Sequence, residues 1–115
     1  MTVKGLIESR RFTLVQEGVQ TEREITVPYC CDLLSIAMSR APEGCAWVTV
    51  MANMNTLAVA SLADAACVIL AEGMELDETA RKKAEEQGIT VLKSGLPVFE
   101  TALTIYEMLK GSKVD

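Results

Sequence analysis

The spacing of apolar positions changes along this chain, and the changes predict where helices and strands lie. Two unbroken apolar runs, Ala46–Ala52 and Ala66–Ala71, are rich in β-branched residues and do not alternate with polar ones. Such runs are typical of parallel strands that are covered on both faces. The apolar segment between them is about the shortest that can cross back and set two strands parallel. The pattern therefore predicts one α/β domain over residues 1–115, with a mostly parallel central sheet and helices on both faces.

Upstream of these runs, the pattern predicts a short helix, two strands and a second helix. The first helix is expected to begin after Thr2, a suitable N-cap. Strands are expected at Phe12–Gln16 and Glu24–Val27, and Pro28 ends the second because proline cannot donate a ladder hydrogen bond. Asp32 is the expected N-cap of the second helix. The apolar stripe expected on that helix comprises Leu34, Ala37, Met38 and Ala41.

The segment between the two apolar runs predicts a helix over Thr56–Ala63, with Asn55 as its N-cap. The residues of this helix are apolar on nearly every side, and Thr56 and Ser61 are its only residues with hydroxyl groups. A helix without a polar face is either buried on all sides or packed on a partner chain. Since half of the chain is hydrophobic, we expect a homo-oligomer, most simply a twofold dimer.

The C-terminal third predicts two further helices and a strand. An amphipathic helix is expected at Glu78–Gln87, with Asp77 as its N-cap. A strand at Ile89–Leu92 follows, and Pro97 opens a last helix that runs to Lys110. The inner face expected for that last helix comprises Phe99, Ala102, Leu103 and Tyr106.

Charge and composition narrow the possible partners and surroundings. The net charge is −5, and an acidic balance argues against nucleic acid, which needs a basic patch. No apolar run approaches the ~20 residues of a membrane span, and the N-terminal residues do not resemble a secretory signal. We therefore expect a cytoplasmic protein that contacts neither nucleic acid nor membrane.

The four cysteines have irregular spacing, and the chain contains no histidine. In a reducing compartment such cysteines are more often buried hydrophobes than disulfides. A zinc site is not expected from this spacing, and no metal or other cofactor is predicted. Two phosphate-binding patterns, the Gly-x-Gly-x-x-Gly fingerprint and the P-loop, are also missing from the sequence. With no histidine for a nucleophile–base pair, no catalytic residue is predicted, and the chain is not expected to be an enzyme.

A candidate ligand site follows from the predicted topology. Ligands of open parallel sheets bind outside the carboxyl ends of the strands, and helix N-termini at that edge favour anions. Three strand-to-helix turns should meet there. The residues predicted to line the site are Asn53, Asn55, Thr56, Glu72, Gly73, Lys93 and Ser94. The competing interpretation is that Asn55 is only a cap, that Gly73 only serves a turn, and that Glu72 and Lys93 are rim charges or an ion pair.

Several segments of the chain resemble the DRTGG domain family. The resemblance rests on Glu22–Thr26, Cys31–Ser35, Ala46–Val50, Asn55 with Leu57–Ala60, and Glu72-Gly73, in the family's order. Arg23 and Thr26 match the motif for which the family is named. Glu22 replaces its aspartate, and Val27-Pro28 replaces its two glycines. The family is similar to the N-terminal domain of HPr kinase/phosphorylase, and the resemblance implies a regulatory or ligand-sensing α/β module.

Three functional hypotheses remain open from the sequence. The first is a stand-alone regulatory module that binds a small anionic metabolite or nucleotide and self-associates. The second is a redox or iron–sulfur accessory protein that uses Cys30, Cys31, Cys45 and Cys67, although thiolate ligands usually show regular spacing. The third is a small enzyme with carboxylates such as Asp32 and Glu72 in one cleft, with shifted pKa values.

Overall fold

Five strands form one sheet in the order β1-β5-β4-β3-β2, in a computed structural model that describes residues 1–112. The four strands β2 to β5 are parallel, and β1 joins β5 antiparallel at one edge. This confirms the predicted α/β fold with a mostly parallel sheet. The strands are β1 Thr13–Gln16, β2 Pro28–Cys30, β3 Ala46–Thr49, β4 Cys67–Leu70 and β5 Thr90–Lys93. The helices are α1 Val3–Glu8, α2 Leu34–Arg40, α3 Met54–Leu62, α4 Glu78–Gln87 and α5 Val98–Ser112.

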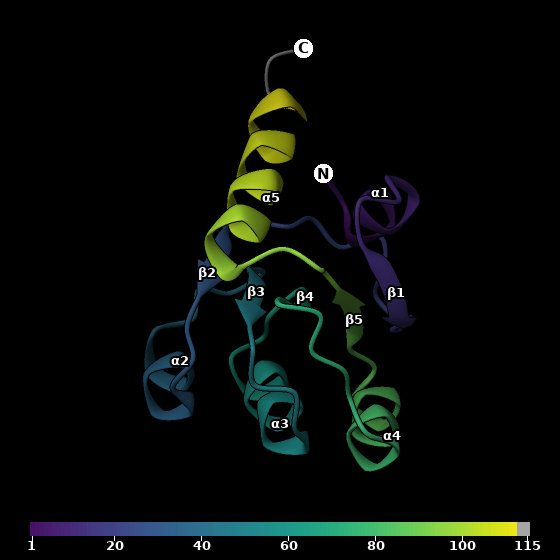
Figure 1. Cartoon of the computed structure of the whole chain (residues 1–115), viewed down its shortest axis with the longest axis vertical. Helices are drawn as coiled ribbons and strands as arrows, with labels where there is room; N and C mark the ends of the chain where they lie inside the picture. The colour runs from purple at the N-terminus through teal and green to yellow at the C-terminus, as the bar shows by residue number, and fades with distance from the viewer. Residues whose placement is uncertain (113–115) are drawn as a thin grey trace.

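Helices cover both faces of the sheet, as expected. Figure 1 shows α2, α3 and α4 on one face and α1 and α5 on the other. Each crossover from β2 through β5 steps to the next strand in the same direction. Connections of the same hand therefore place their three helices on one face. The final helix instead returns across the opposite face, over β2 and β3.

The alternation of side chains along the strands divides the core into two clusters. Trp47, Val68 and Val91 point toward the face that α2, α3 and α4 cover. Val48, Ile69 and Leu92 point toward α1 and α5. Trp47 is fully buried, and its indole N–H donates to the carbonyl oxygen of Cys31 at 2.9 Å. Trp47 is thus an anchor of the core, and its one polar atom has a partner.

Two elements differ from the prediction before the first apolar run. Glu24–Val27 is not a strand, and the parallel strand β2 begins at Pro28 instead. Proline is tolerated here because β2 is an edge strand and Pro28 is its first residue. Asp32 is not the N-cap of α2, since Leu33 holds that position without a side-chain hydrogen bond. The Asp32 carboxylate accepts instead from the Thr49 hydroxyl at 2.7 Å and from the Val50 amide at 2.9 Å.

The two most apolar helices also differ from the prediction. Thr56, Leu57, Val59 and Ala60 of α3 are buried because this helix lies between α2 and α4. The absence of a polar face on α3 therefore needs no partner chain. In α5 the predicted inner face was wrong for Phe99, Leu103 and Tyr106, which are exposed, whereas Ala102 packs against the core as predicted. The residues that α5 buries are Thr101, Ile105 and Leu109.

No helix within the described part of the chain is long and apolar enough to span a membrane.

Candidate functional site at the two edges of the sheet

The carboxyl ends of β3, β4 and β5 meet at one edge of the sheet, as the sequence predicted. Thr49 pairs with Leu70, and Leu70 pairs with Lys93, in the parallel ladders. All seven predicted site residues lie at this edge, in the last residue of β5, the turns that follow the strands, or the first turn of α3. The structure therefore brings their backbones to one edge, and the arrangement of each side chain decides what this edge can bind.

The amide groups at the start of α3 already have an acceptor. Asn53, and not Asn55, is the N-cap: its side-chain oxygen accepts from the amides of Asn55 at 3.0 Å and Thr56 at 3.3 Å. The helix begins two residues earlier than predicted, so Asn55 lies within its first turn. An anion at this helix terminus would have to replace the Asn53 side chain.

The turns after β4 and β5 are joined to each other by backbone hydrogen bonds. The amide of Glu72 donates to the carbonyl of Leu96, and the amide of Gly73 donates to the carbonyl of Ser94, both at 2.8 Å. Glu72 and Gly73 both have positive φ angles, of 58° and 68°. Glycine adopts such an angle without strain, whereas it is uncommon for a residue with a side chain such as Glu72. These bonds close the edge between β4 and β5 and use two of the amides that a ligand would need.

Lys93 and the two hydroxyl residues also have roles inside the fold. The Lys93 ammonium pairs with the Glu75 carboxylate at 2.9 Å, which lowers the pKa of Glu75, and so Lys93 does not pair with Glu72. The Ser94 hydroxyl is buried and lies 2.7 Å from the Thr101 hydroxyl. The Thr56 hydroxyl is buried and makes no hydrogen bond within residues 1–112. The predicted cation is thus neutralised, and the two predicted hydroxyls lie beneath the surface.

The strand order gives a physical reason for this closed edge. Ligand crevices in open α/β sheets form where the strand order reverses and the two adjacent connections leave toward opposite faces. The parallel strands run β2, β3, β4, β5 in sequence, and α2, α3 and α4 all leave toward one face. The connection after β5 differs, because it leads to α5 on the opposite face, but at that point the hydrogen bonds of Glu72 and Gly73 join the turns after β4 and β5.

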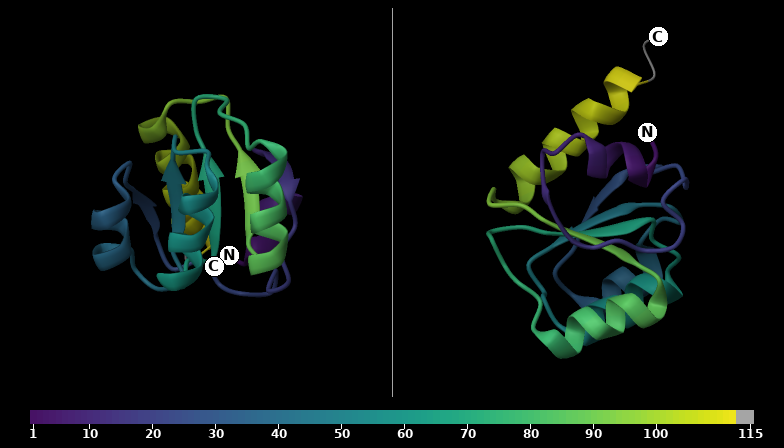
Figure 2. Two further views of the ribbon diagram at one scale, coloured as in Figure 1. Left: turned by 90° about the horizontal axis from the view of Figure 1, so that it is seen from below. Right: turned by 90° about the vertical axis from the view of Figure 1, so that its right-hand side faces the viewer.

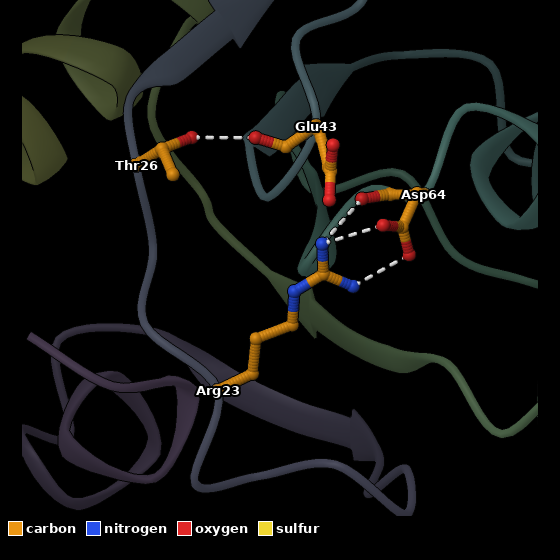
Figure 3. A network of polar contacts seen from close by, with 4 residues as sticks. All are labelled: Arg23, Thr26, Glu43 and Asp64. Carbon is orange, nitrogen blue, oxygen red and sulfur yellow. Dashed lines mark hydrogen bonds and ion pairs between the residues drawn. The ribbon is translucent and has the colours of Figure 1, made fainter.

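At the opposite edge, the amino ends of the strands, a polar network gathers around Arg23 (Figure 3). The Arg23 guanidinium donates to both carboxylate oxygens of Asp64 at 2.7 and 2.9 Å, and to the Asp64 carbonyl at 2.9 Å. These hydrogen bonds lower the pKa of Asp64 and raise that of Arg23. Asp64 holds a positive φ of 60° in the turn after α3. The ion pair therefore connects the segment before β2 to the end of α3.

Thr26 belongs to the same region as Arg23. Its hydroxyl donates to the Glu43 carbonyl at 2.9 Å, and its amide donates to the Gly44 carbonyl at 2.9 Å. Gly44 has a φ of 77°, and a Cβ atom there would lie 2.9 Å from the Thr26 methyl group. Glycine is thus required at position 44 by both the backbone angle and the close approach of Thr26. Arg23 and Thr26 therefore hydrogen-bond the segment before β2 to two loops, one at Asp64 after α3 and one at Glu43 and Gly44 before β3.

A cavity of about 210 Å³ lies beside this network. Its polar lining side chains are Gln20, Arg23, Ser61, Asp64, Gln87 and Thr90. A guanidinium has five N–H donors, and Asp64 accepts three of them. The other two have no acceptor within residues 1–112, so Arg23 can donate to a ligand while it stays bound to Asp64. The sequence analysis missed this site because its residues come from three separate segments of the chain, at 19–23, 60–66 and 87–90.

The four cysteines do not form one ligand set. Cys45 packs in the cluster under α2, α3 and α4, whereas Cys67 packs in the cluster on the opposite face. Burial raises the pKa of the Cys45 thiol to about 11 and that of the Cys67 thiol to about 12. Cys30 is exposed and Cys31 is half-buried at the end of β2. Within residues 1–112, no three metal-ligating side chains come together.

Comparisons with known proteins add no family assignment. No protein-family model matches the chain, and a search of curated proteins found no similar sequence.

Proposed function

We propose that this chain is a regulatory module, similar to DRTGG domains, that binds a small anionic metabolite or nucleotide and self-associates. The observation that carries the proposal is the position of Arg23. It matches the motif of the family that the chain resembles, and it lines a polar cavity with two free N–H donors. A guanidinium with free donors suits a phosphate or a carboxylate.

The electrostatic surroundings of the cavity set the expected strength of binding. Asp64 neutralises the guanidinium charge, and α3 and α4 both end at this edge, where helix carbonyl groups add partial negative charge. An anion therefore gains hydrogen bonds from Arg23 without a large net attraction. We therefore expect weak binding that depends little on the salt concentration.

The amino-edge cavity is a better location for the ligand than the carboxyl edge. At the carboxyl edge, the Asn53 side chain occupies the first amides of α3, and Glu75 neutralises Lys93. Binding there would first have to break these contacts. At the amino edge, the free donors of Arg23 need no such rearrangement.

Amide chemical-shift mapping tests the ligand and its location together. We would titrate the protein with inorganic phosphate, AMP and ATP, each to millimolar concentration. The proposal predicts saturable shifts at Gln20, Ser61 and Gly88 around the cavity. Shifts confined to Asn53, Glu72 and Gly73 would return the site to the carboxyl edge, and no saturable shift with any probe would contradict the ligand part of the proposal.

A matched pair of charge variants sharpens the test. Arg23→Gln should weaken binding of the responding probe at least tenfold, about 1.4 kcal/mol, because it removes the cavity donor. Arg11→Gln makes the same charge change at an exposed position away from the cavity and should leave affinity unchanged. Equal losses in both variants would show a general charge effect and would contradict a specific role for Arg23.

A further inference from the structure

The outward face of α5 carries a continuous apolar stripe. Phe99 is 70% exposed and Tyr106 is 52% exposed, with Leu103 between them. The opposite face of the helix is buried through Ile105 and Leu109. Figure 2 shows that α5 extends past the body of the domain, so its outer side faces away from the rest of the chain. Three large apolar side chains in one line are more than scattered surface hydrophobes require.

The spacing of this stripe matches a helix–helix seam. Leu96, just before α5, is also exposed, and the stripe proceeds by three, four and three residues through Phe99 and Leu103 to Tyr106. Lys110 follows after four more residues. Alternating steps of three and four are the pattern by which two helices pack side by side with interlocking side chains. The stripe therefore fits another helix better than a strand or a flat surface.

We propose that this face pairs with α5 of a second copy of the chain, antiparallel and about a twofold axis. The inference rests on the self-association in the proposed function and names its surface. In the register that sets Leu103 opposite the partner's Tyr106, twofold symmetry repeats the pair, as required for a closed dimer. The same register sets Lys110 opposite the partner's Phe99 and next to the partner's Glu100.

Charge favours the antiparallel arrangement. Lys110 then lies between Glu107 of its own helix, one turn back, and the partner's Glu100, so each lysine is close to two carboxylates. A parallel pair would instead set Lys110 against the partner's Lys110 on the seam. Like charges at such distances repel and oppose a parallel seam.

A groove beside α5 lies where this register needs one. It has a volume of about 270 Å³ and is lined by Thr26, Val27, Pro28, Tyr106, Leu109 and Lys110. Since the partner's Phe99 lies opposite Lys110, its ring can enter this groove. The volume equals roughly nine water molecules at ~30 Å³ each, which leaves room for an aromatic ring. Aromatic anchors in such pockets contribute much of the binding energy of protein interfaces, and twofold symmetry supplies two of them.

Sedimentation equilibrium from about 5 to about 500 μM tests the interface, because single-helix interfaces are small and reversible. The parent protein should show a monomer–dimer equilibrium. Leu103→Glu should weaken it at least tenfold, about 1.4 kcal/mol. Leu62→Glu is the matched control, since Leu62 is a 74% exposed leucine on α3, and it should leave the equilibrium unchanged. If Leu103→Glu loses its far-ultraviolet circular dichroism, Phe99→Glu replaces it at a more exposed position.

The charge pair tests the direction of the helices. Lys110→Glu alone should weaken the dimer, and adding Glu100→Lys should restore it, because the antiparallel pair then has the two charges exchanged. A double variant as weak as the single one would contradict the antiparallel register. A dimer weakened by Leu62→Glu but not by Leu103→Glu would overturn this inference and leave self-association standing. A parent protein that stays monomeric would overturn both, while the ligand titrations test the other half of the proposed function separately.

Discussion

The helices α3 and α5 carry similar apolar residues, yet their surroundings give these residues opposite roles. In α3, apolar side chains lie all round the helix, and neighbours on both sides cover most of them. In α5, the side chains segregate into two faces, and only one face packs on the sheet. The helix that looks more like an interface in sequence is thus the more buried one.

The position of each helix in its layer explains the difference. α3 is the middle of three helices on its face, so α2 and α4 shield its flanks. On the other face, α5 lies over β2 and β3 and extends past the sheet, and the short α1 is the other helix of that layer. A helix in the middle of a layer can be apolar all round and still be buried, whereas the apolar outer stripe of a protruding helix stays exposed in the single chain.

Matched truncations within each helix should show the largest effect of this difference. Leu57→Ala in α3 and Ile105→Ala in α5 remove fully buried side chains and should each lower the free energy of unfolding by about 2–5 kcal/mol. Leu62→Ala and Leu103→Ala remove exposed counterparts and should cost less than about 1 kcal/mol. Urea unfolding at low protein concentration measures all four. A loss at Leu103 as large as that at Ile105 would contradict the orientation of α5.

A smaller effect is expected where α3 begins. Asn53→Ala removes the side chain that accepts two amides and should cost about 1 kcal/mol. Asn55 lies in the first helical turn, and its side chain does not cap the helix. Asn55→Ala should therefore leave stability nearly unchanged. Thermal unfolding of the two variants compares them directly. A larger loss of stability in Asn55→Ala than in Asn53→Ala would contradict Asn53 as the N-cap and favour Asn55, the cap that the sequence predicted.

The smallest expected effect concerns the end of α3, where Arg23 holds Asp64. The pKa of Asp64 is lowered from its ordinary value of 3.8 by hydrogen bonds from Arg23. A carboxylate with a lowered folded-state pKa stabilises the fold above its unfolded value, and this contribution is lost as pH falls through the folded-state value. In urea unfolding between pH 5 and pH 2, the parent should therefore lose stability below about pH 4 more steeply than Asp64→Asn. Identical slopes would show that the ion pair does not contribute.

Much of the fold could be predicted because local chemistry determined it. The apolar runs identified β3 and β4, and Asp77 caps α4 as predicted. The orientation of α5 could not be read from its pattern, because both of its faces hold large apolar residues and the sheet selects Ile105 and Leu109. The predicted site residues share an edge, but the partners of Lys93, Ser94 and Asn53 depend on loops that sequence alone does not place. The cavity at Arg23 combines distant segments, and the sequence pointed to Arg23 only through the resemblance of Glu22–Thr26 to a family motif.

The most direct test of the α5 interface is an isotope-filtered NOE experiment on a mixture of labelled and unlabelled chains at millimolar concentration. Such an experiment records only contacts between different molecules. The antiparallel seam predicts intermolecular NOEs from the Leu103 methyl groups to the ring protons of the partner's Tyr106, and from the Phe99 ring to protons of the partner's Lys110. Intermolecular NOEs that involve Leu62 and α3 instead, or a dimer without any contact at α5, would contradict it.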